Sequence, residues 1–148
     1  MNIQFMRLSD NAVTPKRATA GAAGYDLCYC GSAPAVLKPG DRALLETGIA
    51  LQIPNEQCVA YIYVRSGLAI NNGITLSNCV GVIDSDYRGE IKVGLVNLSN
   101  DEYTVCAGDR IAQIVFSPVI LPVLCETDEI QATDRGSGGF GSTGKLKI

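Results

Sequence analysis

The sequence predicts an all-β domain built from short strands. Segments rich in Val, Ile, Tyr and Phe recur along the chain at strand length. Clusters of Gly, Pro, Asn, Asp and Ser separate these segments and favour tight turns. Within 48–53, Ile49, Leu51 and Ile53 alternate so that they share one face. Because doubling or closing a sheet covers its edges, we expect a sandwich or jelly roll.

The expected elements follow one another closely along the chain. Strands are expected at 48–53, 59–64, 91–97, 110–116 and 119–125. Turns are expected at 39–41, 54–56, 71–73, 99–101 and 107–109. A single short helix is expected at 66–70, where it needs tertiary contacts to be stable.

Size and charge narrow the class of function. A chain of 148 residues with 47% hydrophobic residues has the size and composition of one packed domain. The net charge of -3 opposes an extended nucleic-acid surface, which needs clustered Lys and Arg. No segment has the length of a membrane span, and the first ten residues lack a secretion signal. We therefore expect a cytoplasmic protein without nucleic-acid or membrane partners.

The sequence contains six cysteines and no histidine. The cysteines are scattered through apolar segments, and only Cys28 and Cys30 are close in sequence. Without histidine to complete a zinc site, we expect buried, reduced thiols. The absence of histidine also excludes Ser-His-Asp and Cys-His catalysis. A general base in this chain must be a carboxylate, a lysine or a tyrosine.

The segment 81–90, GVIDSDYRGE, places several charged residues between apolar runs. Asp84, Asp86 and Glu90 are close enough in sequence to form a metal or acid–base site. The alternative is a solvent-exposed hairpin tip, where Asp and Ser are favoured by local hydrogen bonds. Arg65, which follows another apolar run, either binds phosphate or ends a strand.

The segment 135–144, RGSGGFGSTG, combines glycines with one arginine and one phenylalanine. Glycines let backbone N–H groups approach an anion, and Arg135 can bind phosphate oxygens in a two-pronged geometry. Neither a dinucleotide fingerprint nor a phosphate loop is present, because no strand precedes the segment and no helix follows it. The alternative is a disordered tail, but Phe140 favours an arm that closes on a flat ligand.

Five motifs in order give the chain a resemblance to trimeric dUTP diphosphatases (dUTPases). They are AGYDL at 23–27, RSGLA at 65–69, GVIDSDYRG at 81–89, GDRIAQ at 108–113 and the segment 135–144. The resemblance implies a jelly-roll-like β-barrel or sandwich at 1–134 with a short helix. It also implies a flexible, glycine-rich C-terminal arm at 135–148 that closes over the active site.

The resemblance implies hydrolysis of dUTP to dUMP and pyrophosphate by in-line attack of water at the α-phosphorus. This reaction keeps uracil out of DNA and supplies dUMP for thymidylate synthesis. Asp84 takes the position of the general base, and Asp26 supports it by ordering the site and its metal-bound water. The implied cofactor is Mg²⁺, held by substrate phosphates and water without a direct protein ligand.

The resemblance also assigns the substrate contacts. Phosphate contacts map to Arg65, Ser66, Gly67 and Gln113, whereas Arg110 maps to a structural ion pair. Base recognition maps to a hairpin at about 78–92, including Asn78, Gly81, Val82, Ile83 and Lys92. Tyr87 is expected to pack beneath the deoxyribose, where a ribose hydroxyl would clash.

The arm is expected to reach a site formed by neighbouring subunits of a homotrimer. Phe140 would stack on uracil and Arg135 would reach the γ-phosphate, with Gly141 and Ser142 beside them. Two related alternatives remain, a dCTP deaminase and a catalytically silent dUTP-sensing or protein-binding module. A deaminase of this fold carries a catalytic glutamate after the hairpin, and the stretch 91–96, IKVGLV, has no carboxylate. A purely structural β-sandwich leaves the five motifs unexplained.

Overall fold

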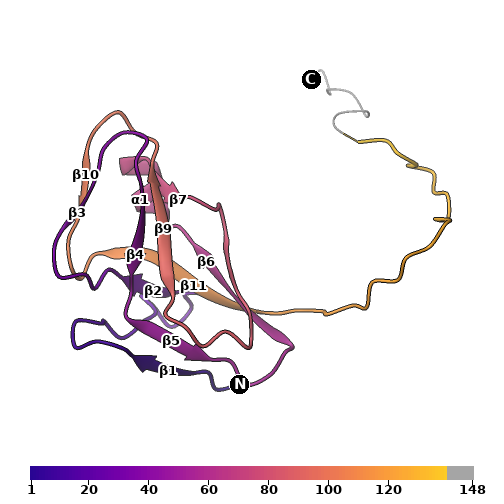
Figure 1. Ribbon diagram of the computed structural model, residues 1–148, viewed down its shortest axis with the longest axis horizontal. Helices are drawn as coiled ribbons and strands as arrows, with labels where there is room; N and C mark the ends of the chain where they lie inside the picture. The colour runs from indigo at the N-terminus through magenta and orange to yellow at the C-terminus, as the bar shows by residue number, and fades with distance from the viewer. Residues whose placement is uncertain (140–148) are drawn as a thin grey trace.

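A computed structural model describes residues 1–139 (Figure 1). The described chain is all-β with one short helix, as the sequence predicts. The strands are β1 (Gln4–Arg7), β2 (Tyr25–Cys28), β3 (Ala35–Leu37), β4 (Arg42–Glu46), β5 (Ile49–Gln52), β6 (Cys58–Tyr63), β7 (Ile74–Leu76), β8 (Gly81–Ile83), β9 (Lys92–Asn97), β10 (Tyr103–Val105) and β11 (Arg110–Pro118). The helix α1 (Ser66–Asn72) lies between β6 and β7.

The strands form four antiparallel sheets around one core. The sheet orders are β1-β5, β10-β3, β2-β11-β6-β8 and β4-β9-β7. Side chains alternate along β9, so that Val93, Leu95 and Asn97 are buried and their neighbours are more exposed. Asn97 is tolerated in the core because its amide donates to the carbonyls of Leu37 and Asp101, at 2.9 and 2.8 Å.

Four predicted strands and the predicted helix are confirmed. They are β5, β6, β9, β11 and α1, with boundaries within a few residues of those expected. The expected turn at 71–73 is instead the end of α1. Gly73 closes this helix in the left-handed conformation, with φ of 65°, and its N–H faces the carbonyls of Leu68 and Ala69. No helix in residues 1–139 has the length and apolar character of a membrane span.

The predicted strand at 119–125 is wrong. After β11 the described chain runs away from the sheets and forms no further strand or helix up to residue 139 (Figure 1). Ile120, Val123 and Leu124 are 88%, 88% and 92% exposed. The residue composition suits a strand, but a strand also needs a neighbouring edge, and this segment has none within its own described chain. Pro122, in the middle of the segment, also lacks the N–H that a ladder requires.

The prediction of buried thiols is correct for only half of the cysteines. Cys28, Cys30 and Cys58 are buried, whereas Cys79, Cys106 and Cys125 are exposed, and all six are free. The buried cysteines lie in or next to strands, and the exposed ones lie in turns and in the segment after β11. Apolar neighbours in sequence therefore do not guarantee burial.

Thiol alkylation should separate these two classes. Burial, and then the negative charge of Asp26, raises the pKa of the Cys28 thiol, and burial also raises the pKa of Cys30. Because the thiolate is the reactive form, Cys28 and Cys30 should react with iodoacetamide much more slowly than Cys79 and Cys106 near neutral pH. Peptide mass spectrometry over a time course measures the rates. Equal rates for Cys28 and Cys79 in the folded protein would contradict this packing.

Candidate functional site

One group of predicted site residues gathers where β2, β11 and β6 lie side by side. Gln113 of β11 faces Asp26 on β2 and Tyr63 on β6. The Arg65 Nε donates to Asp26 Oδ1 at 2.9 Å, and the Arg110 Nη1 donates to Asp26 Oδ2 at 3.2 Å. We call Asp26, Arg65, Arg110 and Gln113 the Asp26 cluster. Arg110 forms an ion pair with Asp26, as the resemblance implies, at 3.2 Å.

The Gln113 side chain joins β11 to the segment that precedes α1. Its amide donates to the carbonyl of Val64 at 3.2 Å. Gly24 makes room for this side chain, since a Cβ at Gly24 would lie 2.7 Å from the Gln113 Oε1. Arg65 has extended backbone and directly precedes Ser66 and Gly67, the exposed first residues of α1.

The Asp26 cluster has the charge of an anion-binding surface. It contains two guanidinium groups and one carboxylate, which leaves one positive charge in excess. Its side chains are partly exposed, with 29% for Arg65 and 52% for Arg110. Guanidinium groups bind phosphate oxygens in a two-pronged geometry, so the cluster can hold a phosphorylated ligand.

A second group lines a cavity of about 370 Å³ on another part of the molecule. We call it the Asp84 pocket. Its lining residues are Leu44, Val82, Ile83, Asp84, Tyr87, Glu90, Ile91 and Lys92. The sequence indicated all of these as candidate site residues except Leu44 and Ile91. Leu44 comes from β4, which pairs with β9, and only knowledge of that pairing could have placed it here.

The expected hairpin at 78–92 is not a pair of adjacent strands. β8 pairs with β6, whereas β9 pairs with β4 and β7 in a different sheet. Residues 84–91 therefore cross from one sheet to the other, with the Asp84 pocket where the strands diverge. β8 is an edge strand, so the backbone groups on its outer side are not used by another described strand.

The crossing segment is held by its own hydrogen bonds. The Tyr87 N–H donates to the Asp84 carbonyl at 3.2 Å, and the Arg88 Nη1 donates to the Ser85 carbonyl at 2.8 Å. The Tyr87 hydroxyl donates to the Glu90 carbonyl at 3.0 Å. Tyr87 is nevertheless 45% exposed, which leaves its ring available to a ligand.

Glu90 is an internal anchor of this segment. Its Oε1 accepts the Gly48 N–H at 2.8 Å, and its Oε2 lies 3.4 Å from the Lys92 Nζ. The hydrogen bond and the charge of Glu90 raise the pKa of Lys92, which is therefore cationic at neutral pH. The interpretation of Asp84, Asp86 and Glu90 as a three-carboxylate metal site is wrong, because Glu90 is engaged by Gly48 and Lys92. Within residues 1–139, no three carboxylate or thiol groups are placed to hold a metal ion together.

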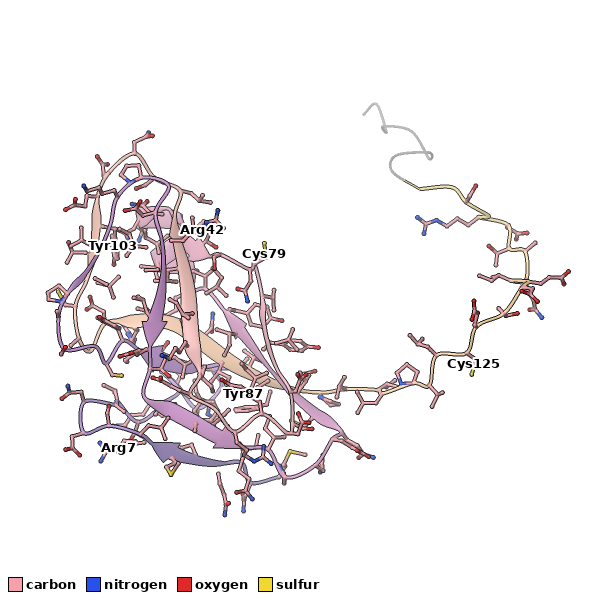
Figure 2. All side chains as sticks on the ribbon, in the orientation of Figure 1. Arg7, Arg42, Cys79, Tyr87, Tyr103 and Cys125 are labelled. Atoms are coloured by element: carbon pink, nitrogen blue, oxygen red, sulfur yellow. The ribbon has the colours of Figure 1, made fainter. Side chains whose placement is uncertain are left out.

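Asn78 does not line the Asp84 pocket. It lies near the start of β8, where its Nδ2 is 3.8 Å from the place of a Cβ on Gly81. Gly81 itself faces Ile62 at the far end of β8 from Asp84. Figure 2 shows the same separation, since Cys79, the neighbour of Asn78, lies well away from Tyr87.

The Asp26 cluster and the Asp84 pocket do not meet within one chain. Ile83 faces Ala60 on β6, and from there β6 runs away from Asp84 toward Arg65. At about 3.3 Å per residue, Asp84 and Arg65 are on the order of 20 Å apart along this direction. A single α-phosphorus cannot contact both groups in one chain.

The C-terminal arm is only partly within the described residues. Arg135 is exposed, and its Nε donates to the Gly138 carbonyl at 2.9 Å. The chain there lies apart from both groups of site residues (Figures 1 and 2). Phe140, Gly141 and Ser142 lie outside the described residues.

Comparison with solved structures finds viral proteins of the same fold. The dUTPase of Staphylococcus bacteriophage 80alpha with bound dUpNHpp is similar with a TM-score of 0.88 and 28% identity, covering 97% of this chain and 99% of that chain. A mutant of the phage phi11 dUTPase, described with a structural Mg(II) ion, has a TM-score of 0.81 and 25% identity, covering 89% and 100%.

Comparison of the sequence gives closer matches among bacteria. Deoxyuridine 5'-triphosphate nucleotidohydrolase of Wolinella succinogenes is 50% identical over 145 residues, which cover 98% of this chain and 95% of the relative. The protein of the same description from Finegoldia magna is 47% identical over 144 residues, covering 97% and 99%. The dUTPase family model matches residues 10–144, which include all five motifs. The chain therefore belongs to the dUTPase family.

Proposed function

We propose that this chain hydrolyses dUTP to dUMP and pyrophosphate, with Asp84 as the general base. This assignment rests on the hydrogen bonds and ion pairs of the two carboxylates in the pocket, Asp84 and Glu90. Glu90 is bound to Gly48 and Lys92, whereas the exposed Asp84 side chain makes no ion pair or hydrogen bond within residues 1–139. A carboxylate so placed is free to take a proton from water during in-line attack at the α-phosphorus.

The Asp84 pocket is the proposed site for the base and the sugar. The free edge of β8, at Gly81, Val82 and Ile83, offers backbone groups that can pair with uracil. Excluding the methyl group of thymine from a close-fitting pocket is worth about 1–3 kcal/mol, and mismatched hydrogen bonds reject cytosine by roughly 10⁴-fold. Tyr87 would lie beneath the deoxyribose, with Lys92 beside it, whereas Asn78 at the start of β8 lies outside this pocket and would contact only a base that extends along the β8 edge.

The Asp26 cluster is the proposed site for the phosphates. Arg65, Ser66, Gly67 and Gln113 would contact them, with Asp26 holding Arg65 and Arg110 in place. Mg²⁺ would neutralise phosphate charge when bound. Because both Asp26 oxygens accept hydrogen bonds from arginines, the donor set suits an ion held by phosphates and water better than one bound directly to Asp26.

We propose a homotrimer in which each active site lies between subunits. The separation of Asp84 from Arg65 supports this assembly, because only two copies can bring both to one nucleotide. The exposed apolar segment at 119–124 supports it as well, since such a surface is usually covered by a partner. The residues of the arm, Arg135, Phe140, Gly141 and Ser142, would close a site from a neighbouring subunit. A cytoplasmic location suits the six free thiols.

No contact among residues 1–139 favours the alternative functions. β9 carries no carboxylate that could serve a deaminase at the Asp84 pocket. A silent sensing module would not require a free Asp84 at the mouth of the base pocket. Hydrolysis of dUTP is therefore the proposed function in which both the Asp84 pocket and the Asp26 cluster take part.

Pyrophosphate release tests the reaction and its base together. The intact chain with Mg²⁺ should release pyrophosphate from dUTP and only weakly from dTTP, dCTP and UTP. Asp84→Asn keeps the shape of the side chain but removes the base, so its kcat should fall by about 10²–10⁴-fold. The matched control is Asp86→Asn, which changes the neighbouring exposed carboxylate outside the pocket lining. Ammonia release from dCTP, or full activity of Asp84→Asn, would contradict the proposal.

Mixing two inactive variants tests whether the site is shared between copies. Asp84→Asn and Arg65→Ala should each have little activity alone. After they are unfolded together and refolded, about a quarter of the sites should draw an intact Asp84 from one copy and an intact Arg65 from another. Steady-state turnover of dUTP should therefore recover to about a quarter of the wild-type rate. Absence of recovery in a mixture shown by native mass spectrometry to contain mixed trimers would rule out a shared site.

Truncation after Asp134 tests the arm. Ordering ten residues costs on the order of 10 kcal/mol, so we expect the arm to settle only over a bound triphosphate. The truncated chain should keep the circular dichroism spectrum and the oligomeric mass of the intact chain, with most of its kcat lost. Near-normal turnover of the truncated protein would exclude a role for the arm in catalysis.

A further inference from the structure

We propose that Glu90 is a positioning residue that sets the preference for deoxyribose over ribose by holding Tyr87 in place. The inference rests on the proposed function, because it assumes that the sugar of dUTP packs on Tyr87. The Glu90 side chain lines the Asp84 pocket, but in this role it acts through Tyr87 and not by contact with the reacting atoms. It acts through a chain of contacts that begins at the start of β5 and ends at the Tyr87 ring.

The Glu90 carboxylate is bound on a rigid support. Its Oε1 accepts the Gly48 N–H at 2.8 Å. Gly48 has a φ of 65°, and a Cβ there would lie 2.6 Å from the Cβ of Ala12, so this backbone position is fixed by close packing and requires glycine. The Oε2 pairs with Lys92 at 3.4 Å, and only 21% of the Glu90 side chain is exposed. The carboxylate therefore has little freedom to move.

The backbone that follows Glu90 is anchored as well. Ile91 is 1% exposed, and its N–H donates to the Ile49 carbonyl at 2.8 Å. Its carbonyl accepts the hydroxyl of Thr47, which is fully buried. The main-chain carbonyl of Glu90 thus lies between the fixed Glu90 side chain and the buried residue Ile91.

Tyr87 is tethered to that carbonyl. Its hydroxyl donates to the Glu90 carbonyl at 3.0 Å, passing so close over Gly89 that any Cβ at Gly89 would collide with it. The ring is 45% exposed and is otherwise held in the crossing segment through the Tyr87 N–H bond to the Asp84 carbonyl. Because the ring is nearly half exposed, we infer that the hydroxyl tether fixes its orientation.

Ring orientation decides the choice of sugar. A ring held flat beneath the deoxyribose leaves no room for a 2′-hydroxyl, whereas a ring that can rotate away accepts one. Loss of the Glu90 anchor should therefore raise activity on UTP relative to dUTP. A purely structural role of Glu90 would lower activity on both nucleotides by the same factor.

The experiment measures the ratio of kcat/KM for dUTP to kcat/KM for UTP in each variant. Both nucleotides are assayed with the same enzyme preparation, so the fraction of folded protein cancels from the ratio. Where UTP turnover is too slow, UTP is measured as a competitive inhibitor of dUTP hydrolysis. For Glu90→Ala the ratio should fall about tenfold, the effect of losing one hydrogen-bonded anchor. Glu90→Gln should stay near wild type, because its amide oxygen can still accept the Gly48 N–H.

Three further variants complete the test. Tyr87→Phe keeps the ring but removes the tether, so its ratio should fall as in Glu90→Ala. The double variant should fall no further than either single change, because both act on one linkage: Glu90→Ala loosens the support of the main-chain carbonyl, and Tyr87→Phe removes the hydrogen bond to it. Glu46→Gln is the matched control, since the Glu46 side chain also pairs with Lys92, at 3.6 Å, but makes no hydrogen bond to Gly48 or Tyr87 in residues 1–139. Its ratio should be unchanged.

The outcomes separate this inference from the function on which it rests. An unchanged ratio in Glu90→Ala, with a wild type that is selective for dUTP, overturns the role of Glu90 and leaves the proposed function intact. The inference is also overturned if the ratio for the double variant falls by the product of the two single-variant factors, because Glu90 and Tyr87 would then act independently. A wild-type chain without dUTP turnover removes the proposed function and this inference together.

Discussion

The divergence of β8 from β9 is the constraint on which the rest of the proposed site depends. β8 pairs with β6 and β9 pairs with β4 and β7, so the segment between them must cross from one sheet to another. The crossing leaves one edge of β8 free and opens a cavity beside it. Asp84 stands at the first residue after that free edge. The proposed pairing of uracil to the backbone and the proposed placement of the general base therefore have one structural origin.

The register of β6 with β8 and β11 separates the Asp26 cluster from the Asp84 pocket. β11 brings Gln113 beside Asp26, and β6 carries the chain on to Arg65 at the opposite end of the sheet from Asp84. In the proposed function, each copy thus presents a base-binding half at one end and a phosphate-binding half at the other. Because neither proposed half holds the whole reaction, we expect activity to depend on assembly, so that loss of subunit contacts removes turnover even where each chain stays folded.

Much of this could be predicted from the sequence where the signal is local or motif-based. The strands β5, β6, β9 and β11 follow from residue composition and turn residues, and the five motifs single out Asp26, Asp84 and Tyr87 as candidate site residues. Pairing partners could not be predicted, because periodicity reports which face of a strand is apolar and not which edge lies beside it. For this reason the expected hairpin at 78–92 is wrong, and the segment at 119–125 lacks the strand predicted for it. The place of Leu44 in the pocket and the hydrogen bond between Gly48 and Glu90 also depend on strand pairing, and the sequence does not predict them.

The two halves of the proposed site carry opposite excess charges, which suit the neutral base and the anionic phosphates of a nucleotide. Asp84 and Glu90 with Lys92 leave the pocket with one excess negative charge, whereas Arg65 and Arg110 with Asp26 leave the cluster with one excess positive charge. A neutral uracil can enter the first, but a triphosphate is attracted to the second and repelled by the first. In the proposed site, the cluster would supply affinity for any nucleoside triphosphate, and the pocket would supply the choice among them. Because the two proposed functions lie on different parts of the chain, selection of dUTP would be a property of the assembled site and not of either half alone.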